Sequence, residues 1–195
     1  MDSTSDDGQG LDRVNPESAP AASPFADNPE RALFDFLETL GVKTETYLHP
    51  PVRTVAESQT IKLDLPGVHT KNLFLKDRDG RLVLISAKAD SPVALNKLHR
   101  ALGLQRLSFA PPEILLTRLG VTPGSVSGFC LINDQVECTA GARVRFVLDR
   151  HLQRADFLNF HPLRNDMTTT IRQEDFVTFC HATGHEIECI PLDGT

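Results

Sequence analysis

The stretch from His69 to Asp77 constrains the fold of this chain most, because it has the pattern of a β-strand with a lysine on an apolar face. Side chains alternate between the two faces of a strand, so Lys71 lies in line with Leu73 and Leu75. An ammonium group in such a place is costly unless it meets an anion, a carbonyl oxygen or water. The alternative is a lysine that extends along a sheet edge into solvent. Both interpretations predict a strand, and the first makes Lys71 a candidate functional residue.

A second strand is expected at residues 81–87, joined to the first by Arg78-Asp79-Gly80. Asp-Gly between two apolar runs is a typical hairpin turn. The run from Leu82 to Ile85 is continuously apolar, as expected for a strand that is covered on both faces. Residues 68–87 therefore predict a hairpin inside a covered sheet.

The rest of the chain alternates between helical and extended patterns. Asn28 is placed to cap a helix whose first residue is Pro29, and Gly41 ends that helix. A capping box, Thr-Val-Ala-Glu, predicts another helix from Thr54, and further helices are expected over 91–101, 112–119 and 174–183. Further strands are expected over 43–47, 129–132, 143–148, 168–171 and 186–190. This mixture predicts an α/β domain with a mixed, mostly antiparallel sheet flanked by helices.

Composition divides the 195 residues into a tail and one domain. Residues 1–26 are rich in Ser, Asp, Gly, Pro and Ala and have hardly any large apolar side chains, so we expect a disordered acidic tail there. Residues 27–195 are expected to form the domain. The hydrophobic content of 40% is sufficient for a core.

Several features of the sequence indicate a cytoplasmic protein. No apolar run approaches the roughly 20 residues that a membrane-spanning helix needs, and the N-terminus has no signal-peptide pattern. The four cysteines show no Cys-x-x-Cys spacing, so we expect reduced thiols. The net charge of −6 argues weakly against a nucleic-acid partner. Residues 62–106, however, hold nine Lys or Arg against four Asp, which either favours phosphate binding or is ordinary solvated charge.

The sequence lacks the motifs of several common chemistries. Segment 124–128, Gly-Ser-Val-Ser-Gly, has the glycine spacing of a nucleophile elbow but carries valine where the serine is required. It has neither a Walker loop nor a dinucleotide fingerprint, so no cofactor is expected. Cys180, His181 and His185 lie close together, but Gly184 separates the histidines and no second ligand pair has metal-site spacing. We therefore expect no metal.

Two loops offer polar groups that could contact a ligand. Segment 161–165, His-Pro-Leu-Arg-Asn, follows Phe157 and Phe160, and a stiff polar loop beside aromatic residues is suited to the mouth of a pocket. Segment 120–128 offers the backbone N–H groups of Gly124, Ser125 and Val126, which could cradle a phosphate or a carbonyl oxygen. For both loops the alternative is an ordinary connection whose polar groups satisfy neighbouring backbone.

A family resemblance rests on segments that occur in a fixed order: Leu65 to Asp77, Arg106 to Ala110, Leu119 to Val126, Leu131 to Asp134, Phe160 to Leu163, Thr169 to Ile171 and Gly184-His185. On these segments the chain resembles the YbaK-type prolyl-tRNA editing family, which includes free-standing deacylases and the editing insertion of bacterial prolyl-tRNA synthetases. It looks most like the free-standing alanyl-tRNA(Pro) deacylase branch, ProXp-ala. The resemblance covers about residues 28–191 and implies a YbaK-like single domain.

The resemblance implies an enzyme that hydrolyses alanine wrongly esterified to proline tRNA, with no metal and no cofactor. Lys71 matches the lysine most tied to activity in that family. The implied substrate-binding positions are Thr70, Asn72, Gly120, Gly124, Ser125 and His161. In the family mechanism the 2′-hydroxyl of the terminal adenosine helps to position or activate water, which agrees with a chain that offers no nucleophile–base pair. The implied partners are the acceptor end of tRNA(Pro) carrying alanine and prolyl-tRNA synthetase, with no DNA and no membrane.

The chain also departs from the family pattern. Ser127-Gly128 stands where a Thr-Pro pair is more usual, and Gln135 to Ala142 replaces a shorter, more charged hairpin. These departures leave the cargo open between alanine, cysteine and another small amino acid. A rival hypothesis is a non-catalytic module that binds tRNA or the synthetase, and a third is a small-molecule hydrolase unrelated to tRNA. The sequence also does not choose whether Lys71 contacts a phosphate or the developing oxyanion.

Overall fold

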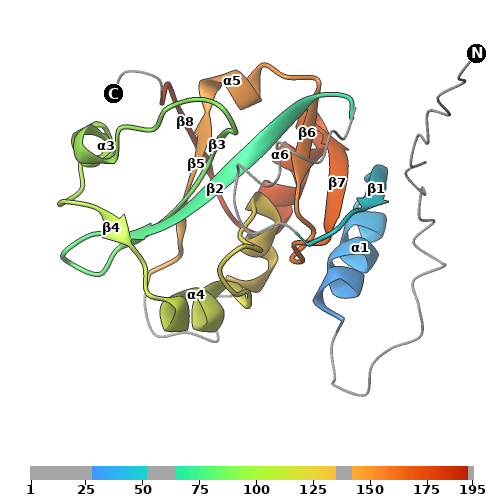
Figure 1. Ribbon diagram of the computed structural model, residues 1–195, viewed down its shortest axis with the longest axis horizontal. Helices are drawn as coiled ribbons and strands as arrows, with labels where there is room; N and C mark the ends of the chain where they lie inside the picture. Colours follow the sequence, from blue (N-terminus) through green and yellow to red (C-terminus); the bar gives the residue numbers. More distant parts are fainter. Residues whose placement is uncertain (1–27, 52–64, 135–141, 193–195) are drawn as a thin grey trace, which may run out of the picture.

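The computed structural model describes residues 28–51, 65–134 and 142–192. Its eight strands form one sheet in the order β1-β7-β6-β2-β3-β5-β8, with β4 paired to β2 outside this row (Figure 1). The strands are β1 (Thr44–Leu48), β2 (Val68–Lys76), β3 (Leu82–Lys88), β4 (Ser108–Phe109), β5 (Arg145–Asp149), β6 (Phe157–Phe160), β7 (Met167–Arg172) and β8 (Ile187–Ile190). Four pairings are antiparallel and three are parallel, which confirms a mixed, mostly antiparallel sheet.

Helices pack on both faces of this sheet. They are α1 (Pro29–Thr39), α3 (Leu95–Ala101), α4 (Pro112–Leu119), α5 (Arg150–Gln153), α6 (Gln173–Ala182) and the 3₁₀ helix η2 (Gly128–Asn133). The larger core lies between one sheet face and α1, α4, η2 and α6, and Phe129, Phe160, Phe176 and Phe179 pack edge to face or tilted within it. The smaller core lies on the opposite face, where Leu98 of α3 packs with buried residues of β2, β3 and β5. The sheet is therefore flanked by helices, as predicted.

The predicted hairpin of β2 and β3 is present, and a buried carboxylate fixes its turn. The strands pair antiparallel from Thr70 with Lys88 to Lys76 with Leu82. Asp77 Oδ1 accepts hydrogen bonds from the backbone N–H of Asp79 and of Arg81, both at 2.9 Å. Arg81 Nε also donates to Asp77 Oδ2 at 2.7 Å. Burial alone would raise the pKa of Asp77, but these hydrogen bonds outweigh it and lower the pKa below its ordinary value.

The prediction of a strand over Phe129 to Ile132 is wrong, because these residues belong to η2. Phe129, Cys130 and Leu131 are all buried, and an apolar run of this length does not distinguish a strand from a fully buried helix. Ser127 caps η2 by accepting a hydrogen bond from the N–H of Phe129 at 3.2 Å. The signal for a helix was therefore the serine that precedes the apolar run.

Other element boundaries differ from the sequence expectation. The strand β6 and the short elements β4 and α5 were not predicted, and α3 begins at Leu95 instead of Ser91. The helix α1 starts at Pro29 as expected, but the side chain of Asn28 makes no capping hydrogen bond. The predicted tail at 1–26, the predicted helix from Thr54 and segment 135–141 lie outside the described residues. Within the described ranges, none of the helices has the length and apolarity needed to cross a membrane.

Candidate functional site

Lys71 lies on the apolar face of β2 that the alternation predicted. Leu75, further along the same face, is fully buried in the smaller core, and Leu73 packs against that core. Lys71 itself is half-buried, and its Nζ donates a hydrogen bond to the backbone carbonyl of Ser91, in the connection between β3 and α3. The ammonium group thus meets a carbonyl oxygen at the border of an apolar core. An ammonium has three N–H donors, so two remain for other acceptors.

The face that carries Lys71 becomes polar toward β6, β7 and β1. The strand register aligns His69 with Asn159, Asn159 with Thr170, and Thr170 with Glu45. Continuing the alternation of β6 places His161 on the same face, in line with Thr168 and Tyr47. We call this surface the polar face and define it by Glu45, Tyr47, His69, Lys71, Asn159, His161, Thr168 and Thr170.

His161 is one of two half-buried histidines of this face, with His69, and a backbone carbonyl fixes the tautomer of His161. Its Nδ1 lies 2.7 Å from the carbonyl oxygen of Met167, so Nδ1 carries the proton and donates it. Burial lowers the pKa of His161, and the nearby His49 and His69 lower it further, against the opposing effects of Met167 and Asp166. Nε2 has no hydrogen-bond partner among the described residues. The neutral ring therefore presents Nε2 as an acceptor.

His49 belongs to the same cluster and was missed by the sequence analysis. It is buried, and its ring centroid lies 5.8 Å from that of His161. Nε2 of His49 lies 3.0 Å from Thr168 Oγ1, and Nδ1 lies 2.8 Å from the carbonyl oxygen of Pro50. The sequence signal for His49 is that it continues the series Glu45 and Tyr47, which lie two residues apart on one face of the strand. This signal points to the site only when the pairing of β1 with β7 is known.

Asn159 joins β2, β6 and β7 at the start of β2. Its Oδ1 accepts from Thr170 Oγ1 at 2.5 Å, and its Nδ2 donates to the carbonyl oxygen of Pro66 at 3.0 Å. Its backbone carbonyl accepts from Thr70 Oγ1 at 2.8 Å. Gly67, at φ 90°, approaches β6 so closely that a Cβ would lie 2.3 Å from the carbonyl oxygen of Phe157. These contacts hold the start of β2, and with it Lys71, against β6.

Thr70 and Asn72 lie together, on the face of β2 opposite to Lys71. Nδ2 of Asn72 donates to Thr70 Oγ1 at 3.4 Å, and Oδ1 of Asn72 accepts from the buried Ser86 Oγ at 2.6 Å. Both residues are half-buried. The structure therefore brings Thr70 and Asn72 into contact, whereas Lys71 and His161 share only the polar face, on the other side of the sheet.

The loop from Gly120 to Gly128 has structural reasons for its glycines. Gly120 ends α4 at φ 67°, and a Cβ there would lie 2.8 Å from Nδ2 of Asn133, which donates to the carbonyl of Leu119. Gly124 has φ 98°, a conformation that favours glycine. The N–H of Ser125 donates to the carbonyl of Thr122 at 3.1 Å, so it is not free for a ligand as the sequence analysis had suggested. Of the three backbone N–H groups expected to bind a ligand, the one of Ser125 is therefore already bonded within the loop.

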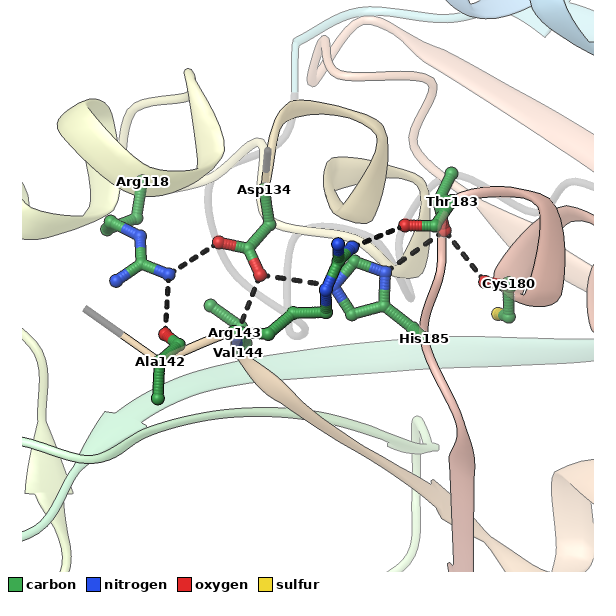
Figure 2. A network of polar contacts seen from close by, with 8 residues as sticks. All are labelled: Arg118, Asp134, Ala142, Arg143, Val144, Cys180, Thr183 and His185. Atoms are coloured by element: carbon green, nitrogen blue, oxygen red, sulfur yellow. Dashed lines mark hydrogen bonds and ion pairs between the residues drawn. The ribbon is translucent and has the colours of Figure 1, made fainter. Parts of the chain in front are cut away.

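A buried polar network closes this loop at both ends (Figure 2). Asp134, at the end of η2, accepts from Arg118 Nη2 at 2.6 Å, from the N–H of Val144 at 2.7 Å and from His185 Nε2 at 3.1 Å. Burial alone would raise the pKa of Asp134, but these three donors outweigh it and lower the pKa to about 2. The loop that begins after Arg118 and ends before Asp134 is thus tied at its base by one ion pair.

The same network accounts for His185, which the sequence analysis weighed as a metal ligand. Nδ1 of His185 lies 3.1 Å from Thr183 Oγ1, which donates to the carbonyl of Cys180 at 2.9 Å (Figure 2). Arg143 Nη1 donates to the carbonyl of Thr183 at 2.7 Å. Burial raises the pKa of the Cys180 thiol, so this sulfur stays protonated. Within the described ranges, no group of His, Cys, Asp and Glu is arranged to hold a metal ion.

A hollow of about 530 Å³ lies at the far end of β2, next to β4, and is lined by Arg78, Arg106, Leu107 and Ser108. Both arginines are exposed, and the neighbouring Phe109 is 62% exposed. Part of the positive charge that the sequence places in 62–106 therefore surrounds a concave surface.

Comparison with known proteins relates this chain to editing domains. Residues 49–179 match the family of aminoacyl-tRNA editing domains. The chain is 35% identical over 165 residues to the prolyl-tRNA synthetase associated domain-containing protein 1 of Danio rerio, covering 84% of this chain and 87% of the relative. It is 31% identical over 164 residues to the prolyl-tRNA editing protein ProX of Acetoanaerobium sticklandii, covering 84% and 97%.

A solved structure shares the fold. It is a candidate trans-editing enzyme for prolyl tRNA synthetase, with a TM-score of 0.63 and 18% sequence identity over 87% of this chain and 99% of that one. The matched family segment begins at His49 and includes Lys71, Asn159 and His161.

Proposed function

The chain belongs to the family of aminoacyl-tRNA editing domains, and on that basis we propose that it is a trans-editing deacylase that hydrolyses alanine from mischarged tRNA(Pro). The name of one relative, the prolyl-tRNA editing protein ProX, supports an editing reaction on this tRNA. The name of another relative, the prolyl-tRNA synthetase associated domain-containing protein 1, supports a link to the synthetase. The observation that carries the proposal is the ammonium group of Lys71, held by the Ser91 carbonyl where an apolar core meets the polar face. A tRNA substrate and reduced thiols fit a cytoplasmic protein.

Lys71 supplies the positive charge of the proposed site. An aminoacyl ester is already activated, so its hydrolysis needs a positioned water and stabilisation of the oxyanion that forms at the carbonyl. The Ser91 carbonyl occupies one donor of the ammonium and orients the other two. These two donors stabilise the developing oxyanion, and the half-buried position strengthens that interaction relative to water.

His161 supplies the acceptor of the proposed site. Its neutral ring, with the proton on Nδ1, accepts a hydrogen bond at Nε2 from the attacking water or from the 2′-hydroxyl of the terminal adenosine. The substrate hydroxyl completes the activation of water, so no protein nucleophile takes part. Thr70, Asn72, Gly120 and Gly124 remain the proposed positions for binding the acceptor end. Ser125 also remains a proposed position, through its side chain, because its N–H is bonded to the carbonyl of Thr122. The hollow beside Arg78 and Arg106 offers a place for the phosphates of the tRNA.

The test is release of alanine from purified Ala-tRNA(Pro) by wild-type protein and by Lys71→Ala. We expect Lys71→Ala to lower the single-turnover rate by about 10²- to 10³-fold, the usual loss when one donor to an oxyanion is removed. Lys88→Ala is the matched control, because Lys88 lies on the neighbouring strand, faces the opposite side and pairs only with the exposed Asp90 among the described residues. It should retain the wild-type rate.

Different outcomes discriminate the rival hypotheses. If wild type leaves the ester intact at high enzyme concentration, hydrolysis is the wrong assignment. Tight, salt-dependent tRNA binding in that case identifies a binding module. If wild type cleaves Cys-tRNA(Pro) or another small aminoacyl-tRNA faster than Ala-tRNA(Pro), the reaction stands and the cargo changes.

A further inference from the structure

His49 contacts the residues on both sides of Met167, the residue whose carbonyl orients His161. Its backbone N–H donates to the carbonyl of Asp166 at 3.0 Å, and its Nε2 lies 3.0 Å from Thr168 Oγ1. Between these two contacts lies Met167, whose carbonyl oxygen accepts from Nδ1 of His161 at 2.7 Å. One residue just after β1 therefore brackets the carbonyl on which the tautomer of His161 depends.

We propose that His49 is a positioning residue, which holds the segment from Asp166 to Thr168 so that the Met167 carbonyl keeps His161 in its Nδ1-protonated form. The effect of His49 on catalysis rests on the proposed deacylase function. The effect of His49 on the tautomer of His161 is independent of that function and can be measured without any substrate.

The side chain of His49 is itself fixed in one orientation. Nδ1 donates to the carbonyl of Pro50 at 2.8 Å, since a carbonyl can only accept. Nε2 of the neutral ring is then an acceptor for the Thr168 hydroxyl. The ring packs 5.8 Å from the His161 ring, at 51° between the planes. His49 thus limits the position of the His161 ring by direct packing as well as through Met167.

The charged or chargeable groups that shift the pKa of His161 come from different elements. His49, which follows β1, and His69 from β2 both lower the pKa of His161, whereas Asp166 raises it. The carboxylate of Asp166 is bound by Arg164 through two hydrogen bonds, at 3.0 and 2.7 Å. A variant that removes His49 therefore changes the geometry next to His161 and also removes a ring that can become positively charged, so the variants must separate these two effects.

Three substitutions make this separation. His49→Leu removes the ring nitrogens, and Thr168→Val removes the hydroxyl that binds Nε2 while keeping a β-branched side chain. His49→Gln can keep the hydrogen bond to Thr168 but cannot become charged. Thr46→Val is the matched control, because Thr46 Oγ1 bonds Thr169 Oγ1 at 2.9 Å between β1 and β7 but on the opposite face.

The first measurement is the tautomer of His161 in the full chain, from the ¹⁵N chemical shifts of its two ring nitrogens by NMR. Wild type, His49→Gln and Thr46→Val should show the Nδ1-protonated tautomer. His49→Leu and Thr168→Val should show a mixture of the two tautomers. An unchanged tautomer in His49→Leu, or a mixture in Thr46→Val as well, overturns the proposal.

The second measurement is the steady-state rate of deacylation. We expect His49→Leu to lower kcat about tenfold with KM nearly unchanged, because misplacing a catalytic group costs rate more than binding. His49→Gln should stay within about twofold of wild type. If the tautomers behave as expected while wild type releases no amino acid, the positioning role holds and the proposed function fails. If wild type is active and His49→Leu retains its kcat, the positioning role fails.

Discussion

Asp134 offers the most direct test of how this fold holds its α4–η2 loop. Its side chain is fully buried and accepts from Arg118, Val144 and His185 (Figure 2). Asp134→Asn keeps the shape but removes the charge and turns one acceptor into a donor that faces these donors. The Arg118 side chain is only 11% exposed, and its Nε already has no partner among the described residues. Leaving such a cation without its anion costs about 3–5 kcal/mol.

The pH dependence of this loss follows from the lowered pKa of Asp134. A fall from the ordinary 3.8 to about 2 corresponds to about 2 kcal/mol of stabilisation at neutral pH. Because the folded-state pKa is the lower one, this stabilisation is present above pH 3.8 and is lost as the pH falls through about 2. Roughly half of it should be gone at pH 3.

Urea unfolding at pH 7 and at pH 3 measures both quantities. We expect Asp134→Asn to lower the free energy of unfolding by about 3–5 kcal/mol at pH 7 and by about 1 kcal/mol less at pH 3. Asp90→Asn is the control, because the Asp90–Lys88 pair is exposed and contributes little. A loss at pH 7 no larger than that of Asp90→Asn, or an equal loss of Asp134→Asn at both pH values, would refute the reasoning.

Two further predictions concern the start of β2 and the polar face. Gly67→Ala should destabilise the fold by about 2 kcal/mol or more in urea unfolding, since the new Cβ would meet the backbone oxygen of Phe157 at 2.3 Å. Gly80→Ala has a similar φ of 83° but open space around it, so it should cost only about 1 kcal/mol, and equal losses would contradict the role of close approach. The acidic limb of kcat/KM should lie below pH 6.5, because the pKa of His161 is lowered and its neutral, active form persists to lower pH. Deacylation rates measured from pH 5 to 8 and corrected for spontaneous hydrolysis test this. If the acidic limb of kcat/KM lies at or above pH 6.5 in wild type and disappears in His161→Gln, the His161 ring is not buried from water as described.

Local pattern was enough to predict the hairpin and the face on which Lys71 lies. Alternation along β2 assigned Lys71 to the side of Leu73 and Leu75, and Asp-Gly assigned the turn. Both depend on residues that are close in sequence. The strand β6 escaped prediction because its sequence, Phe-Leu-Asn-Phe, puts apolar side chains on both faces and so shows no alternation.

The polar face could not be predicted, because it depends on pairings between distant segments. His69 meets Asn159 through a parallel register across 90 residues, and His49 reaches Thr168 across 119. No periodicity within one segment encodes such a register. For the same reason, Asn159 and His49 looked like ordinary polar residues of a loop and a strand end.

Lys71 lies on one face of β2, and Thr70 and Asn72 lie on the other, but all three border the same edge of that strand. β2 pairs with β6 only at Val68 and His69, and with β4 only at Leu75 and Lys76. Between these pairings, residues 70–74 have β3 on one side and no strand on the other among the described residues. Thr70, Lys71 and Asn72 all lie at this unpaired edge, so side chains from both faces border it. A substrate approaching the edge can contact both faces at once, which is why the two-face arrangement supports the proposed assignments.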